Sequence, residues 1–101
     1  LLLGVTYKPD VADVRHSPAE PLAAELLTAG CRVTFHDSYV DEFAVRGRVI
    51  PVSRDLEADV ADADLVIVVQ RHRAYRDDLL ARARLRLDPC GPARTAREAG
   101  S

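Results

Sequence analysis

The chain has 101 residues, of which 48% are hydrophobic and 30% charged, and its formal net charge at pH 7 is −2. This length supports a single hydrophobic core and is too short for two domains, and the nearly neutral balance gives no overall attraction to nucleic acid or to an anionic membrane. No apolar run approaches the roughly 18 residues of a membrane span, so the sequence predicts neither a membrane anchor nor a signal peptide.

The first segment predicts a strand followed by an unusually long loop. Leu1 to Val5 is an apolar run typical of a buried strand, and its true beginning is expected upstream, since the chain contains no methionine and opens inside this run. The stretch from Thr6 to His16 is longer than the two to six residues that usually join a strand to a helix. A connection of this length is expected either to have a function or to be disordered, and the close spacing of Lys8, Asp10, Asp13 and Arg15 favours a function.

The next segment predicts a helix from Pro18 to Ala29. Ser17 and Glu20 form an S-x-x-E capping box, and Pro18 stands at the first helical position, where its missing N–H is no loss. Gly30 is a suitable C-terminal stop. The expected apolar stripe of this helix is Leu22, Leu26 and Leu27.

The middle of the chain predicts two more strands and a second helix. Residues 31–36 alternate and are rich in β-formers, which indicates a strand that ends at Asp37. Residues 37–47 are expected to be a loop with a short helical turn, and residues 49–52 a short strand. Ser53 is the expected cap of a helix that runs to Ala61.

The last third predicts a buried strand, a helix and an edge strand. The apolar run from Leu65 to Val69 indicates burial on both faces, as in the middle of a parallel sheet. Residues 75–83 have the spacing of an amphipathic helix, and residues 85–87 read as an edge strand. We expect one domain over residues 1–88 and a flexible C-terminal tail over residues 89–101.

Alternating strands and helices indicate an α/β fold, a doubly wound, Rossmann-like parallel sheet of about five strands flanked by helices. Ligands of such sheets bind beyond the carboxyl ends of the strands, where the long loop begins. The loop contains Lys8, the only lysine of the chain, and Arg15, which together with the helix N-terminus suit a phosphate group. Tyr7 adds an aromatic face for a base or sugar. The alternative is that Arg15 pairs with Asp13 or Asp10 to brace the loop while Lys8 is solvated.

The sequence lacks the motifs of several other functions. The glycine pattern GxGxxG does not follow the first strand, so this segment is not expected to bind NAD itself. A receiver-type phosphorylation domain needs an acidic pair after the first strand and a lysine after the last, and neither is in place. His16, His36 and His72 stand at no ligand spacing, and Cys31 and Cys90 match no disulfide or zinc pattern. We therefore expect no metal and no self-contained catalytic set.

The pattern from Gly4 to Ala19, GVTYKPDxxDVRxSPA, resembles the start of the C-terminal, UDP-binding domain of the UDP-glucose/GDP-mannose dehydrogenase family. The resemblance continues in Leu26-Leu27 and Gly30, in Val33 through His36-Asp37-Ser-Tyr-Val40, and in Ala63 through Val69 followed by His72. It covers about residues 1–87.

The resemblance implies part of a cytoplasmic, NAD-dependent enzyme of polysaccharide biosynthesis, which oxidises the C6 hydroxyl of a nucleotide sugar to a carboxylate through a cysteine thiol. That cysteine and the NAD-binding and central domains would lie upstream, so this segment alone is expected to be inactive. The resemblance also allows a homodimer. By similarity, Tyr7 and Lys8 would line the UDP-sugar pocket, and Asp10, Asp13, Arg15 and Ser17 would shape or support the loop.

Three departures from the family pattern support an alternative function. His16 stands where the family usually has glutamate and Ser38 where it has proline, and the sequence after Asp88 lacks the Asp-x-Arg-Asn pattern whose arginine reaches the UDP. Arg94 is a poor substitute for that arginine. The alternative is a non-catalytic α/β assembly module with a degenerate nucleotide site.

Overall fold

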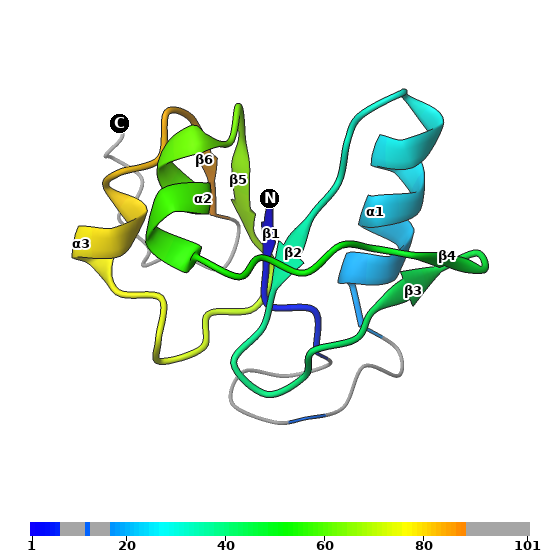
Figure 1. Ribbon diagram of the computed structural model, residues 1–101, viewed down its shortest axis with the longest axis horizontal. Helices are drawn as coiled ribbons and strands as arrows, with labels where there is room; N and C mark the ends of the chain where they lie inside the picture. The colour runs from blue at the N-terminus through cyan, green and yellow to red at the C-terminus, as the bar shows by residue number, and fades with distance from the viewer. Residues whose placement is uncertain (7–11, 13–16, 89–101) are drawn as a thin grey trace.

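The protein is represented by a computed structural model that describes residues 1–6, 12 and 17–88. The helices and strands in chain order are β1 (Leu2–Leu3), α1 (Ala19–Thr28), β2 (Phe35–His36), β3 (Ala44–Val45), β4 (Arg48–Val49), α2 (Leu56–Asp62), β5 (Val66–Val68), α3 (Asp77–Leu80) and β6 (Arg86–Leu87). Four of these strands form a parallel sheet in the order β2-β1-β5-β6, and β3 and β4 form a separate antiparallel hairpin (Figure 1).

The predicted α/β class with a parallel sheet is confirmed. The sheet has four strands among the described residues, slightly fewer than the five or so expected. The difference arises at the segment predicted as a strand over residues 49–52, where Val52 makes a single parallel bridge to Phe35 and no named strand of this sheet forms. α1 lies on one side of the sheet and α2 and α3 lie on the other (Figure 1).

Both faces of the sheet are buried, because side chains along each strand alternate between two cores. Leu2 and Ile67 face the core that contains α1 and the β3–β4 hairpin. Leu3 and Val68 face the core that contains Val60 of α2. This arrangement explains why the segment around β5 is apolar at every position and not only at alternate ones.

α1 ends as the sequence predicts. Gly30 has φ +89°, in the left-handed region that favours glycine. The N–H groups of Gly30 and Cys31 donate to the carbonyl oxygens of Leu27 and Leu26, both at 3.0 Å. This is the Schellman pattern, which satisfies carbonyl groups that the helix itself leaves unbonded.

The buried face of α1 differs from the predicted stripe. Its fully buried residues are Ala19, Ala23 and Ala24, whereas the predicted leucines are only partly buried and pack at the margin of the core. Small alanine side chains let the helix backbone lie close to the sheet. The leucines then cover the border of that contact.

The segment predicted as a loop with a helical turn, residues 37–47, instead contains β3 and the turn of the β3–β4 hairpin, and β4 follows it directly. Its two turn residues are Arg46, with φ +53°, and Gly47, with φ +79°. Positive φ at both central positions is typical of the type I′ turn, whose twist matches that of paired strands. The prediction was wrong because arginine at the first position is not among the usual signals for this turn.

The second and third helices also begin at other residues than predicted. Asp55, not Ser53, caps α2: its side chain accepts a hydrogen bond from the N–H of Ala58 at 3.3 Å. The Ser53 hydroxyl donates to Asp59 instead. α3 covers only Asp77–Leu80 of the predicted residues 75–83.

None of the described helices is long and apolar enough to cross a membrane. The predicted tail over residues 89–101 lies outside the described residues.

Candidate functional site

The carboxyl ends of β1, β2 and β5 meet at one edge of the sheet, and Asp37 connects the first two. Asp37 follows β2 directly, and its side chain is completely buried. Its Oδ2 accepts a hydrogen bond from the N–H of Val5 at 2.7 Å, and its Oδ1 accepts one from the N–H of Tyr39 at 2.8 Å. Both oxygens therefore act as acceptors, as expected of a carboxylate whose burial needs compensation by donors.

His72, which comes after β5, connects this third strand to Asp37. Its side chain is also completely buried, and its Nε2 lies 2.9 Å from Asp37 Oδ2 and 3.2 Å from the hydroxyl oxygen of Thr6. Because the Asp37 carboxylate only accepts, Nε2 carries the proton and donates to it. Thr6 is the last described residue before the long loop, so the loop starts from a tethered position.

Thr6, His72 and Asp37 have the composition of a catalytic triad but not its geometry. In a triad the hydroxyl contacts one ring nitrogen of the histidine and the carboxylate contacts the other. Here both oxygens approach the same atom, Nε2, and Thr6 and His72 are 0% and 1% exposed. The cluster therefore holds strand ends together and does not activate a nucleophile.

Tyr75 and His36 form a second polar pair beside this cluster. The Tyr75 hydroxyl donates to the carbonyl oxygen of His36 at 2.9 Å and lies 2.9 Å from His36 Nδ1. A phenol has one hydrogen, so Nδ1 must be the donor in the second contact, which defines the His36 tautomer.

Burial sets the protonation of this pair. Desolvation lowers the pKa of His36 below its usual 6.5, opposed by the negative charge of Asp37 and assisted by His72. Desolvation, followed by the charge of Asp37, raises the pKa of the Tyr75 phenol. At neutral pH the imidazole of His36 and the phenol of Tyr75 are therefore both uncharged.

Gly4 is required where the loop leaves β1. Its φ is +84°, and a Cβ at this position would lie 2.4 Å from the carbonyl oxygen and 2.8 Å from the Cβ of Gln70. The chain after β5 thus passes directly against the end of β1, at a distance that excludes any side chain. The glycine that starts the family-like pattern has a packing role here.

Most of the predicted site residues lie outside the described residues. These are Tyr7, Lys8, Asp10, Asp13 and Arg15. Ser17 is described and buried, and its Oγ accepts a hydrogen bond from the N–H of Ala19 at 3.0 Å, so it supports the start of α1.

The residues that sequence reasoning missed are Asp37, His72, Thr6 and Tyr75. The sequence did contain a signal, because Asp37 and His72 each come shortly after a predicted strand of the sheet, and parallel strands end at a common edge. Among the described residues, no group of His, Cys, Asp or Glu is suited to hold a metal ion.

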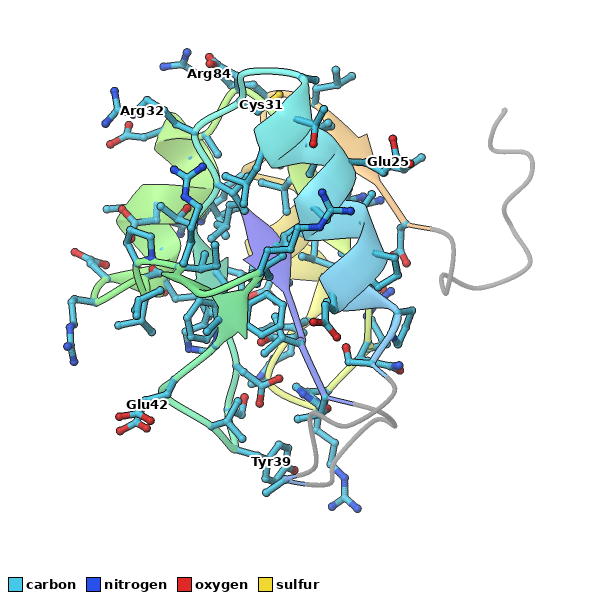
Figure 2. The ribbon with its side chains drawn as sticks, turned by 90° about the vertical axis from the view of Figure 1, so that its right-hand side faces the viewer. Glu25, Cys31, Arg32, Tyr39, Glu42 and Arg84 are labelled. Atoms are coloured by element: carbon cyan, nitrogen blue, oxygen red, sulfur yellow. The ribbon has the colours of Figure 1, made fainter. Side chains whose placement is uncertain are left out.

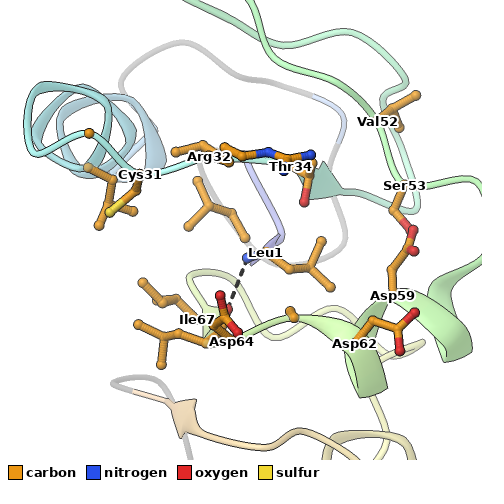
Figure 3. Close-up of a pocket in the computed structure, with 16 residues that line it drawn as sticks. Leu1, Cys31, Arg32, Thr34, Val52, Ser53, Asp59, Asp62, Asp64 and Ile67 are labelled. Atoms are coloured by element: carbon orange, nitrogen blue, oxygen red, sulfur yellow. Dashed lines mark hydrogen bonds between the residues drawn. The ribbon is translucent and has the colours of Figure 1, made fainter.

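A cavity of about 620 Å³ lies at the opposite end of the strands, around Leu1 (Figure 3). Its lining includes the apolar Leu26 and Ile67 and the carboxylates of Asp59, Asp62 and Asp64. Three carboxylates repel a phosphate group, although Arg32 contributes one guanidinium. This cavity therefore does not suit a nucleoside diphosphate. The carboxyl edge of the parallel sheet remains the candidate site.

A profile described as the UDP binding domain of the UDP-glucose/GDP-mannose dehydrogenase family matches residues 1–90. The chain belongs to this family. The match includes the whole parallel sheet, the tethered start of the loop at Thr6 and the polar cluster around Asp37 and His72.

Two curated proteins are similar to the chain. The UDP-N-acetyl-D-mannosamine dehydrogenase of Methanocaldococcus jannaschii is 33% identical over 76 residues, which cover 75% of this chain and 16% of that protein. The UDP-glucose 6-dehydrogenase of Rhizobium meliloti is 33% identical over 78 residues, 74% of this chain and 17% of that protein. The chain thus spans about one sixth of the length of these relatives. No solved structure matches the chain significantly.

Proposed function

We propose that the chain is the UDP-binding part of an NAD-dependent nucleotide-sugar 6-dehydrogenase, which oxidises the C6 hydroxyl of a UDP-sugar to a carboxylate. The observation that carries the proposal is the tethered loop at the carboxyl edge: the loop leaves from Thr6, which contacts His72, and returns at Ser17, which supports α1. Ligands of doubly wound sheets bind at this edge, and membership of the family supports UDP as the ligand.

Within this proposal, Tyr7 and Lys8 contact the nucleotide sugar. The Lys8 ammonium supplies a point charge for the diphosphate, and the Tyr7 ring supplies an apolar face. Asp10, Asp13, Arg15 and Ser17 shape and support the loop. The described residues on either side of this segment support the assignment: Thr6 contacts His72 at the end of β1, and Ser17 supports the start of α1.

NAD is proposed to bind elsewhere in the parent enzyme and to accept the hydride there. The residues after β1 do not fit this cofactor, because Gly4 is followed by Val5 and Thr6 and not by the glycine-rich turn that holds a pyrophosphate. We accordingly propose upstream NAD-binding and central domains as partners, a cytoplasmic location, and no catalytic activity of this segment alone.

UDP titration into the 101-residue chain, followed by ¹H–¹⁵N NMR, tests the proposal. With part of the pocket supplied by other domains, we expect a Kd in the millimolar range, about −4 kcal/mol. Lys8→Ala should abolish the binding. Arg46→Ala, which removes an exposed cation from the hairpin turn, should leave it unchanged.

A second candidate is the non-catalytic assembly module, and one observation favours it. Leu85 and Leu87 flank Arg86 at the edge strand β6 and are 62% and 53% exposed, and exposed apolar edge strands promote association. The absence of any UDP-induced shift up to ~10 mM, together with an oligomer in light scattering, would favour this candidate over nucleotide binding.

A further inference from the structure

Tyr39 differs from the other exposed apolar residues in its chemistry and position. It is 42% exposed, and the remaining large hydrophobic side chains exposed in the described part of the chain are the aliphatic Val49, Leu85 and Leu87. Those three lie on the hairpin and near the edge strand. Tyr39 is the third residue after β2, at the carboxyl edge, and Figure 2 shows it at the end of the molecule opposite Cys31.

The backbone and the ring of Tyr39 are each held by the buried cluster. The backbone N–H donates to Asp37 Oδ1 at 2.8 Å. The ring contacts His72 in a T-shaped arrangement, with centroids 4.9 Å apart and planes at 74°. Asp37 also holds His72 at 2.9 Å, so one buried carboxylate positions both the backbone and the ring contact.

His72 covers only part of the Tyr39 ring. In a T-shaped pair, the edge of one ring meets the face of the other, so at least one face of Tyr39 is not used by His72. The ring therefore combines an exposed surface with a position fixed before any ligand arrives. Such pre-organisation reduces the entropy that binding would otherwise cost.

We propose that the Tyr39 ring is the surface on which the base of the bound nucleotide stacks. The inference rests on the proposed UDP-binding function and adds one contact to that site. Stacking of a base on an aromatic side chain depends on the π-face of the base and not on phosphate. The proposal therefore distinguishes Tyr39 from Lys8: Tyr39 acts on the base and Lys8 on the diphosphate.

Titrations with UDP and with inorganic pyrophosphate test this division of roles in the 101-residue chain. Tyr39→Ala should weaken UDP binding about ten-fold or more, which corresponds to the loss of one stacking contact. Its pyrophosphate affinity should stay within about two-fold of the original chain. Tyr39→Phe, which restores the ring, should recover the UDP affinity.

Two controls separate stacking from a general structural effect. Val49→Ala removes an exposed apolar side chain from β4 of the hairpin, which is not part of the parallel sheet, and should alter neither titration. Circular dichroism should show that Tyr39→Ala is folded, since this side chain is partly exposed and contributes little to the core.

The outcomes distinguish the stacking proposal from the function on which it rests. If the original chain binds UDP and Tyr39→Ala binds it equally well, the stacking contact is refuted and UDP binding stands. If Tyr39→Ala weakens UDP and pyrophosphate to the same extent, Tyr39 does not act on the base and the inference is also refuted. If the original chain does not bind UDP, both the function and the inference are wrong.

Discussion

Replacement of Asp37 by asparagine should show how much the buried carboxylate contributes to stability. Asp37 Oδ2 accepts hydrogen bonds from Val5 N–H and His72 Nε2–H, and Oδ1 accepts one from Tyr39 N–H. An asparagine of the same shape has one acceptor oxygen. If this oxygen takes the place of Oδ2, the amide NH₂ points at the Tyr39 N–H and that hydrogen bond is lost.

The expected cost follows from these contacts. A hydrogen bond to a charged group contributes about 1.5–3 kcal/mol, so the free energy of unfolding should fall by about 2–3 kcal/mol in Asp37→Asn. A domain of this size has about 5–15 kcal/mol in total, and the variant should still fold. Asp37→Ala leaves all three donors without this acceptor and should be less stable than Asp37→Asn.

Urea unfolding followed by far-UV circular dichroism measures this loss. With a slope of about 1.5 kcal/mol per molar urea, the midpoint of Asp37→Asn should fall by about 1–2 M. Asp41→Asn, the same chemical change at an exposed position in the following loop, should alter stability by less than about 0.5 kcal/mol. Equal midpoints for these two asparagine variants would refute the role of Asp37 as the hub of the cluster.

Two further predictions concern His36 and Gly4. Because burial lowers the pKa of His36 below its usual 6.5, the unfolded chain takes up this proton more readily. The contribution of His36 to the free energy of unfolding should be constant above about pH 6.5. It should decrease as the pH falls through the lowered pKa of His36. Urea midpoints between pH 7.5 and 5.5 should therefore decline less steeply in His36→Gln, and an unchanged slope would contradict the assignment. Gly4→Ala forces a Cβ against Gln70 at positive φ and should cost more than about 3 kcal/mol, whereas Gly47→Ala, which has open space at φ +79°, should cost only about 1–2 kcal/mol in the same assay.

Local pattern was sufficient for much of the fold. The helix predicted over residues 18–29 is observed over Ala19–Thr28, and the apolar run at residues 65–69 contains β5. These predictions depend on periodicity, capping and glycine positions, all of which act within a few residues. The hairpin turn at Arg46 and Gly47 was missed because its first residue is atypical for that turn.

The sequence by itself determined the α/β class and the family, because both are recorded in contiguous residues. Only the tertiary structure decided that Asp37, His72 and Thr6 meet. Asp37 is 35 positions from His72, and Thr6 is 66 positions from it. Their contact depends on the strand order β2-β1-β5, which brings three strand ends to one edge, and a local sequence pattern carries no information about that order.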